Sequence, residues 1–403
     1  MAGAPAGPPR ARCRPTCPTR VTRRCQATTA SPPPVGRDDR PGRRSRQSET
    51  SPRCRVPPAS VTVVASPTCV APSWQATTGA VLNLPPPIGA PEAAGCLLGL
   101  ALGDALGAPF EGSPPRGPEP IDRLLAADTS LRWTDDTHMM LALADALLAR
   151  DLTVDPQHLG DTFAQAYRHQ PWRGYGSGPP RIFAMASAGR SYLEAAASLF
   201  GGSGSLGNGA AMRCAPVVIA GWPDADRTWQ LATEQALVTH SHPEGIDGAV
   251  LLSAVLRLAV ATPAAAPLTL AAITADAPPL RSSALRAAWD ALRTVSAAAE
   301  GTRDRQGLLE LAGELGTSVT ARTSVPAAIA VALHAPDDVV DTVRAAVGLG
   351  GDTDTVAAMA AAITGAHLGS GAIPPRLLER LEARERIAST ATALARASQA
   401  KGP

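Results

Sequence analysis

Residues 99–112 read G-L-A-L-G-D-A-L-G-A-P-F-E-G, with glycine at every fourth position of the first nine residues. Gly99, Gly103 and Gly107 therefore lie on one face of a predicted helix, because residues four apart in an α-helix share a face. A face of glycines has no side chains, so the backbone of another helix can approach it closely. Residues 357–362, A-A-M-A-A-A, form a second segment of small residues that allows such packing. The pattern predicts helices joined by tight contacts.

Helical spacing continues along the chain from Glu92 onward. Apolar residues recur at steps of four across residues 246–258, for example. Ser282 is a candidate N-cap for a helix that includes Leu285, and Pro326 is expected at the first position of another helix. No pair of alternating β-branched runs is joined by a hairpin turn. The sequence therefore predicts an all-α fold, a single-domain bundle of many helices.

The composition supports this fold class. Aromatic residues are 3% and charged residues 18% of the 403 positions, and much of the 45% hydrophobic share is alanine. A chain rich in Ala and Leu and poor in aromatics favours helices over a β-sandwich or barrel. No stretch approaches the ~18 consecutive apolar residues of a transmembrane helix, so a membrane protein is not expected. Outside the first 90 residues the cysteines are Cys96 and Cys214, which predicts no disulfide framework and a cytoplasmic location.

The first 90 residues differ from the rest of the chain. They carry 13 Arg against three acidic residues, and 17 of the 39 Pro. Such a segment buries too little apolar surface to offset its ordering entropy, so we predict a disordered basic extension over residues 1–90. No apolar segment follows Arg23 and Arg24, which disfavours a twin-arginine signal, and no aromatic interleaves the Arg run, which disfavours a nucleic-acid partner. We expect the catalytic domain at 91–385 and a C-terminal tail at 386–403.

Two acidic clusters stand at predicted helix starts. One is W-T-D-D-T-H-M at 133–139 and the other is G-L-G-G-D-T-D-T-V at 348–356. Ordinary N-capping explains one Asp or Thr at a helix start, because these side chains accept hydrogen bonds from free backbone N–H groups. Each cluster has two carboxylates, however, and capping needs one side chain. The two clusters therefore also indicate a metal site.

If the two helix starts converge, four carboxylates repel one another, and a hard divalent cation removes that repulsion. Oxygen ligands without Cys select Mg²⁺, Mn²⁺ or Ca²⁺ over Zn²⁺. Thr134 and Thr355 add hydroxyl oxygens beside the clusters. Glu111 lies just past the glycine-stepped helix, and it joins such a site only if its loop brings it there.

A glycine-rich segment, G-G-S-G-S-L-G-N-G at 201–209, contains the G-x-G-x-x-G spacing of dinucleotide-binding folds. That fingerprint needs a strand before it, and the preceding S-Y-L-E-A-A-A-S-L-F is helical in character, which argues against a Rossmann-type NAD enzyme. The backbone N–H groups of such a loop still suit a phosphate. His240 and His242, in T-H-S-H, are two residues apart, and both a ligand contact and a structural role are open for them.

Six motifs follow one another along the chain: G-C-L-L-G-L-A-L-G-D-A-L-G (95–107), W-T-D-D-T (133–137), S-L-G-N-G-A-A-M-R (205–213), T-H-S-H (239–242), S-V-P-A-A-I (324–329) and G-L-G-G-D-T-D-T (348–355). In this order they resemble the ADP-ribosylglycohydrolase family, over roughly residues 93–383. The resemblance implies an orthogonal multi-helix bundle. It also implies two Mg²⁺ ions, or Mn²⁺ in some members, in a central cleft that holds the ribose of ADP-ribose.

The resemblance further implies roles for individual residues. The implied metal ligands are Thr134, Asp135, Asp136, Asp352, Asp354 and Thr355. The implied catalytic residues are Glu111, Asp135 and Asp136, and the implied substrate contacts are Gly204, Ser205, Gly207, Asn208 and His240. One departure from the family pattern is Leu206, where many members carry an aromatic residue.

A protein of this kind would be a metal-dependent hydrolase that cleaves the ribosyl C1″ bond of ADP-ribosylated proteins or small ADP-ribosyl conjugates and releases ADP-ribose. The alternative is a non-catalytic ADP-ribose-binding module on the same fold. The presence of Glu111 and of every metal-ligand position favours the hydrolase. We expect a monomer whose partner is an ADP-ribosylated protein or an ADP-ribose conjugate, and neither a membrane nor a nucleic acid.

Overall fold

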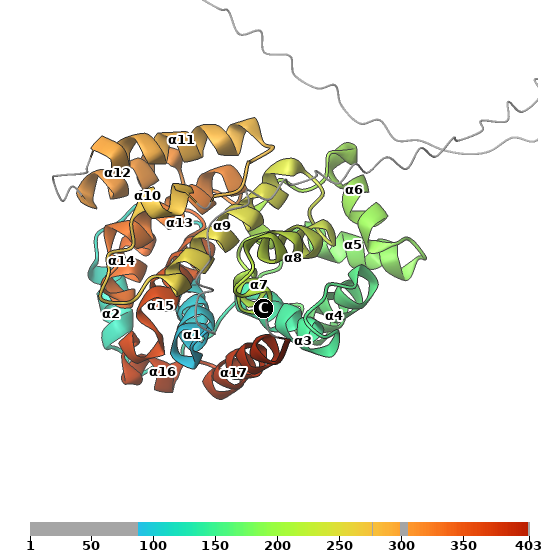
Figure 1. The fold of residues 1–403 in the computed structure, drawn as a ribbon, viewed down its shortest axis with the longest axis horizontal. Helices are drawn as coiled ribbons and strands as arrows, with labels where there is room; N and C mark the ends of the chain where they lie inside the picture. Colours follow the sequence, from blue (N-terminus) through green and yellow to red (C-terminus); the bar gives the residue numbers. More distant parts are fainter. Residues whose placement is uncertain (1–87, 276, 299–304, 402–403) are drawn as a thin grey trace, which may run out of the picture. The chain divides into compact units, whose positions relative to one another are not determined.

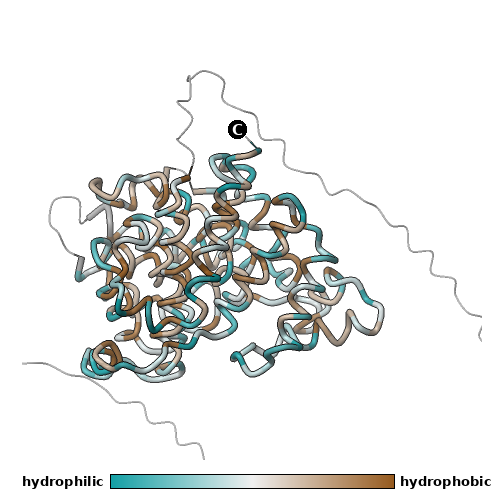
Figure 2. The backbone as a smooth tube through the Cα atoms, turned by 90° about the horizontal axis from the view of Figure 1, so that it is seen from below, coloured by the Kyte–Doolittle hydropathy of each residue, from teal (hydrophilic) through white to brown (hydrophobic). Residues whose placement is uncertain are grey.

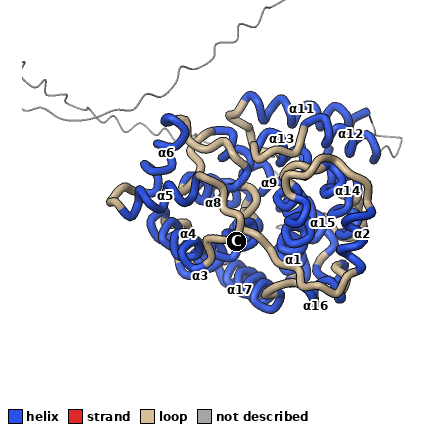
Figure 3. The backbone as a smooth tube through the Cα atoms, turned by 180° about the vertical axis from the view of Figure 1, so that it is seen from behind, coloured by secondary structure: helices blue, strands red, loops and turns tan. Residues whose placement is uncertain are grey.

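The computed structural model describes residues 88–275, 277–298 and 305–401, which form a helical body (Figure 1). The extension predicted for residues 1–90 lies outside the described residues, except for its last three. The described part contains seventeen α-helices and three short 3₁₀ helices, and no β-strand occurs in it (Figure 3). The prediction of an all-α fold is confirmed.

The helices follow one another in the order of their labels. The first eight are α1 Ala90–Gly107, α2 Glu119–Ala126, α3 Asp135–Ala149, α4 Pro156–His169, α5 Gly178–Ser187, α6 Tyr192–Gly202, α7 Ala215–Gly221 and α8 Ala225–Leu237. The others are α9 Pro243–Ala261, α10 Leu270–Ala275, α11 Ser283–Ala298, α12 Arg305–Leu315, α13 Ala321–His334, α14 Val339–Leu349, α15 Thr353–Leu368, α16 Pro375–Arg380 and α17 Arg384–Lys401. The 3₁₀ helices are η1 Ala108–Phe110, η2 Asn208–Ala210 and η3 Ser370–Ala372.

Helices α1 and α15 pack directly against each other and lie side by side in Figures 1 and 3. A Cβ atom added to Gly103 would collide with the Ala357 carbonyl group, so the two backbones are in contact. The facing pairs are Gly95 with Gly365, Gly99 with Ala361, Gly103 with Ala357 and Gly107 with Thr353. The close contact predicted for the glycine face is confirmed, and the alanine-rich segment is its partner in an antiparallel pair.

The antiparallel pairing places the end of α1 beside the beginning of α15. Thr353 Oγ1 donates a hydrogen bond of 2.9 Å to the carbonyl oxygen of Gly107. Glu111 follows Gly107 after the short helix η1. The pairing therefore delivers Glu111 to the same end of the bundle as the acidic cluster that begins α15.

Helix α1 with η1 is long and apolar enough to cross a membrane by length and composition alone, but 83% of that window is buried among the other helices. Leu97, Leu100 and Leu102 are part of the hydrophobic core. Burial inside the protein accounts for the apolar composition of this helix. Figure 2 shows hydrophobic stretches passing through the middle of the helical body.

Helix α13 begins at Ala321, five residues before the position that the sequence predicts, and Pro326 lies inside it. The earlier start is possible because other segments accept the first backbone N–H groups. Ala321 N donates to the carbonyl of Leu206, and Arg322 N donates to the carboxylate of Glu244. Pro326 then falls in the second turn, where its missing N–H costs one intrahelical hydrogen bond.

The tail predicted for residues 386–403 is instead, up to residue 401, most of helix α17. This helix packs against α1, α3 and α7. Ile387, Ala391 and Leu394 are buried along one stripe. Because the buried stripe includes Thr390 and Ser398 and its other members are few among Arg, Ser and Thr, its apolar periodicity is weak in the sequence.

Candidate active site

Glu111 and the two acidic clusters meet in one cavity of about 370 Å³. The cavity is lined by most of the site residues that the sequence predicts: Glu111, Asp135, Asp136, Ser205, Gly207, Asn208, His240, Asp352, Asp354 and Thr355. Two predicted residues do not line it. Thr134 caps α3, since its Oγ1 accepts a hydrogen bond of 3.4 Å from Asp136 N. Gly204, at φ +74°, packs so closely on Ser241 that a Cβ atom there would collide with the serine hydroxyl.

Glu111 lies beside the cluster that begins α15. The backbone after Glu111 pairs with the segment before Asp352: Gly112 N donates to Gly351 O at 2.7 Å, and Gly351 N donates to the carbonyl of Ser113 at 2.8 Å. One carboxylate oxygen each from Glu111, Asp352 and Asp354 lie within 4.8 Å of one another. Partial burial, with the negative charge of Asp352, raises the pKa of Glu111.

The two helix starts contact each other directly. Thr355 Oγ1, on α15, donates a hydrogen bond of 3.4 Å to Asp136 Oδ2, on α3. Thr134 Oγ1 donates to the same oxygen, also at 3.4 Å. The convergence that the metal interpretation requires is therefore present, and two hydroxyl groups donate to one oxygen of Asp136.

Asp104, in the middle of α1, holds the first cluster in place. Its carboxylate accepts hydrogen bonds from Thr134 N at 2.9 and 3.0 Å, from Thr137 N at 3.0 Å and from the Thr137 hydroxyl at 2.6 Å. The side chain is fully buried, and burial raises its pKa to about 6 despite these donors. A carboxylate from one helix thus binds the free N–H groups at the start of another.

The pKa values of the aspartates in the two clusters are raised, first by burial and then by the charges of their neighbours. Burial, reinforced by the charge of Asp104, raises the pKa of Asp135 to about 8. Burial and the charge of Asp352 raise the pKa of Asp354 to about 9. The pKa of Asp136 is raised well above its usual value by burial first, and then by Asp104 and Asp354. Such a cluster is unfavourable at neutral pH unless a positive charge lies within it.

The donor atoms fit a hard divalent cation. Asp136 Oδ1 and Asp354 Oδ1 are buried and have no hydrogen-bond partner among the described residues. Buried carboxylate oxygens rarely lack partners, and a metal ion would satisfy both. The surrounding atoms are carboxylate and hydroxyl oxygens, which suit Mg²⁺ or Mn²⁺ rather than Zn²⁺. The acidic cluster is therefore a candidate metal centre.

The glycine-rich loop forms another wall of the cavity. Asn208 Nδ2 donates to Asp352 Oδ2 at 2.6 Å and to Ser324 Oγ at 3.0 Å, so this amide ties the loop to the second cluster. Two backbone N–H groups of the loop are used within the protein: Gly207 N donates to Ser205 Oγ, and Asn208 N donates to Val319 O. These hydrogen bonds therefore hold the loop in place before any ligand binds.

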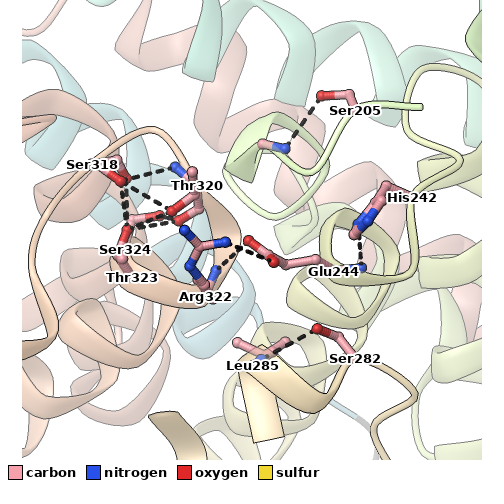
Figure 4. Close-up of polar contacts among 11 residues, drawn as sticks. Ser205, His242, Glu244, Ser282, Leu285, Ser318, Thr320, Arg322, Thr323 and Ser324 are labelled. Carbon is pink, nitrogen blue, oxygen red and sulfur yellow. Dashed lines mark hydrogen bonds and ion pairs between the residues drawn. The ribbon is translucent and has the colours of Figure 1, made fainter. Parts of the chain in front are cut away.

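The segment that supports the loop is rich in hydroxyl groups (Figure 4). Ser318, Thr320 and Thr323 form a network of hydrogen bonds of 2.9 to 3.0 Å at the start of α13. Beside it, the buried carboxylate of Glu244 accepts from Arg322 Nη1 at 3.3 Å (Figure 4). These contacts fix the start of α13 against α9 and the loop.

Arg173 joins three segments behind the cavity. Its guanidinium lies 3.6 Å from the centre of the Trp133 ring and donates to Trp133 O at 2.8 Å. It forms two hydrogen bonds with the Glu382 carboxylate, at 2.9 and 2.6 Å. Gly174, the next residue, lines the cavity beside Asp135. Arg173 therefore connects two segments of the cavity wall. One is the turn that carries Asp135, and the other is the loop that begins at Gly174.

A model of the ADP-ribosylglycohydrolase family matches residues 90–403 of the chain. The chain belongs to the ADP-ribosylglycohydrolase family. The resemblance of its six motifs is confirmed, and the matched region includes α17.

Several relatives share most of this region. The chain is 33% identical over 315 residues to the ADP-ribosylhydrolase ARH3 of Danio rerio, covering 70% of this chain and 83% of that protein. It is 30% identical over 344 residues to the Homo sapiens protein of that name, covering 76% and 93%. The uncharacterized protein YegU of Escherichia coli is 31% identical over 330 residues, covering 76% and 96%.

A solved structure described as an ADP-ribosylglycohydrolase-related protein complex has the same fold. It is 30% identical, with a TM-score of 0.57, and the match covers 77% of this chain and 98% of that chain.

Besides Arg173, three further residues of this ADP-ribosylglycohydrolase cavity or its support were given no role by the sequence patterns. Asp104 is an acid inside an apolar helix, which is a signal of a buried polar contact. Phe200 lines the cavity, and the residue is 50% exposed, with its backbone at φ +51°. Arg213 ends the motif of the glycine-rich loop and is fully buried. The position of each depends on tertiary contacts that no spacing in the sequence encodes.

Proposed function

We propose that this chain hydrolyses the ribosyl C1″ bond of ADP-ribosylated proteins or small ADP-ribosyl conjugates in a metal-dependent reaction, and that it releases ADP-ribose. The observation that carries the proposal is the meeting of Glu111 with both acidic clusters in a cavity that the glycine-rich loop also lines. Family membership supports it, since relatives at 30 to 33% identity are named ADP-ribosylhydrolases.

The acidic clusters would hold two Mg²⁺ or Mn²⁺ ions. Their ligands in this proposal are Thr134, Asp135, Asp136, Asp352, Asp354 and Thr355. When bound, such ions supply positive charge that orients the ribose hydroxyls and lowers the pKa of a nearby water. Asp104 and Asn208 fix the carboxylate-bearing segments beforehand, so little reorganisation is needed on binding.

Glu111 would transfer the proton that the reaction needs. Cleavage of the C1″ bond builds positive charge on the ribose, while the departing group needs a proton or the attacking water needs a base. Glu111 is the solvent-exposed carboxyl among the acids of the cavity, and burial with the charge of Asp352 raises its pKa above that of an ordinary glutamate, which strengthens it as a base. It therefore suits either task better than the buried aspartates do.

The rest of the ADP-ribosyl group would lie along the glycine-rich loop. Gly207 and Gly209 line the cavity without side chains, so the diphosphate can approach the backbone, and the Ser205 hydroxyl lies beside them. The exposed face of Phe200 suits stacking with the adenine base. Leu206, the departure from the family pattern, does not line the cavity, and Phe200 would supply the aromatic contact instead.

The test is a panel of defined ADP-ribosyl linkages, on Arg, Ser, other residues, nucleic-acid ends and O-acetyl-ADP-ribose, incubated with the protein in Mg²⁺ or in EDTA. We expect release of ADP-ribose from at least one linkage in Mg²⁺, and none in EDTA or with Asp354→Asn. Tight binding of ADP-ribose without any release would indicate the non-catalytic binding module instead.

A further inference from the structure

Arg213 is a fully buried cation whose partners are all uncharged in the described part of the chain. Its Nε donates to Gln235 Oε1 at 2.8 Å, and its Nη2 donates to Gln235 O at 3.0 Å and to Thr239 Oγ1 at 2.8 Å. The guanidinium also lies over the Phe163 ring, 4.5 Å from its centre. Burial lowers the pKa of Arg213 to about 9 although the charge of Asp135 opposes the shift, so the cost of burying this cation is only partly offset. Its hydrogen bonds to uncharged groups therefore need a functional explanation.

The Thr239 hydroxyl connects Arg213 to His240. Thr239 Oγ1 lies 2.8 Å from His240 Nδ1, and both residues are buried. A guanidinium only donates hydrogen bonds, so Oγ1 must accept from Arg213. The hydroxyl hydrogen then needs an acceptor, because an unpaired buried O–H is unfavourable. His240 Nδ1 is the acceptor within reach among the described contacts.

The other nitrogen of His240 faces the glycine-rich loop. A Cβ atom added to Gly209 would lie 3.3 Å from His240 Nε2, and one added to Gly207 would lie 3.6 Å from it. His240 lines the cavity, and no described residue bonds to Nε2. Burial and the charge of Arg213 lower the pKa of His240 to about 3, so the ring is neutral at working pH.

We propose that Arg213 and Thr239 are positioning residues that hold His240 as the neutral tautomer with its hydrogen on Nε2. The ring then donates a hydrogen bond into the cavity and does not accept one. The ligand group that lies against Gly207 and Gly209 must therefore be an acceptor, such as a phosphate or sugar oxygen. The identity of that ligand as an ADP-ribosyl group rests on the proposed function, whereas the tautomer does not.

The tautomer can be read directly in the ligand-free protein. Nuclear magnetic resonance of protein labelled with ¹⁵N-histidine distinguishes Nε2–H, Nδ1–H and the charged ring, and His240→Gln assigns the signal. We expect the Nε2–H pattern for His240, unchanged between pH 5 and 8. A wild-type spectrum with the Nδ1–H form or with a charged ring would overturn the proposal.

Two variants test the role of the hydroxyl. Thr239→Val removes the hydroxyl at constant shape, and we expect it to lose the pure Nε2–H pattern and to bind ADP-ribose roughly tenfold more weakly. Thr239→Ser keeps the hydroxyl and should retain both properties. With a cleavable substrate, KM should rise more than kcat falls for the valine variant, because Glu111 and the acidic clusters are unchanged.

Equal spectra for the serine and valine variants would refute the positioning role, whatever their stability. The spectrum is recorded without ligand, so failure of the proposed function is seen separately. If the proposed function fails, no linkage in the panel is cleaved and ADP-ribose does not bind. The Nε2–H pattern of His240 would then still support the positioning role of Arg213 and Thr239.

Discussion

The Thr137 hydroxyl donates a hydrogen bond of 2.6 Å to Asp104, in a fully buried contact between α3 and α1. Two backbone N–H groups at the start of α3 donate to the same carboxylate, which thus does for α3 what an N-cap residue does for its own helix. Because α1 also packs against α15, a single helix positions both acidic clusters.

Thr137→Val should destabilise the protein, because it leaves a buried oxygen of Asp104 without its shortest hydrogen bond. A cost of about 1–3 kcal/mol would lower the melting temperature by roughly 2–6 °C. Thr137→Ser keeps the hydroxyl and should melt close to wild type. Thermal melts recorded in EDTA separate this effect from metal binding. Equal melting temperatures for the two variants would disprove the argument.

Without metal, the protein should lose stability as the pH rises from about 4 to about 9. The pKa values of Asp135 and Asp354 are raised to about 8 and about 9, so in this range the folded state binds more protons than the unfolded chain. Melting temperatures in EDTA should therefore fall with pH, and Mg²⁺ should reverse the fall by binding only the native state.

Asp354→Asn is the matched control for that pH dependence. It cannot ionise, so its melting temperature in EDTA should fall less steeply, and at pH 8 it should exceed that of wild type. Its activity should be greatly reduced because the cluster loses a charge that a divalent cation needs. A wild-type melting temperature that is flat or rises with pH in EDTA would contradict the role assigned to burial and repulsion.

Glu111→Gln should reduce turnover by roughly 10²–10⁴-fold if Glu111 transfers a proton. Binding of ADP-ribose should weaken much less, because both acidic clusters are retained. Single-turnover rates beside calorimetric titration separate this role from metal ligation, in which binding and rate fall together and added Mg²⁺ partly restores them. Near-wild-type rates for Glu111→Gln would show that Glu111 takes no part in the chemistry. The control for loss of a charge is Glu119→Gln, at the exposed start of α2.

Arg173→Lys should weaken the affinity for Mn²⁺ roughly tenfold although it keeps the charge. Lysine cannot reproduce the paired hydrogen bonds to Glu382 or the stacking on Trp133, so the turn that carries Asp135 loses its support. Glu382→Gln should act similarly, and the double variant should cost less than the sum of the two. Arg386→Lys, at an exposed ion pair with Asp145, should have no effect on the titration.

Gly103→Ala should destabilise the protein by about 1–3 kcal/mol or more, because the new methyl group would overlap the backbone of Ala357. This outcome opposes the gain of about 1 kcal/mol that alanine brings to an exposed helix position. The methyl group added by Gly371→Ala would have no atom within 4 Å, so this variant serves as the control. Denaturant unfolding of both variants would decide which effect is larger.

Local patterns predicted several of the helices. Leu285 N donates to Ser282 Oγ at 3.2 Å, as expected of the predicted cap, and both acidic clusters stand at helix starts. These features depend on a few neighbouring residues, so spacing and capping chemistry reveal them. The burial of α17 and the early start of α13 depend on packing partners, so no local pattern reveals either.

The sequence predicts which residues belong to the site more readily than it predicts the contacts that hold them in place. Thr134 and Asp136 stand out as capping and acidic residues, but their anchor, Asp104, is 30 residues or more away. The glycine face of α1 predicted a close contact without naming its partner, because many helices have small residues. The support from Arg173 and the buried charge of Arg213 likewise come from contacts between segments far apart in the sequence.

The pairing of α1 with α15 joins residues that are separated by most of the body, such as Gly107 and Thr353, 246 positions apart. During synthesis at about 5–20 residues per second, α1 would wait roughly 12–50 s for its partner. Its apolar face is exposed in that interval, and the many non-local contacts predict slow folding. We expect chaperones to act on the nascent chain in this period, before the acidic clusters can come together.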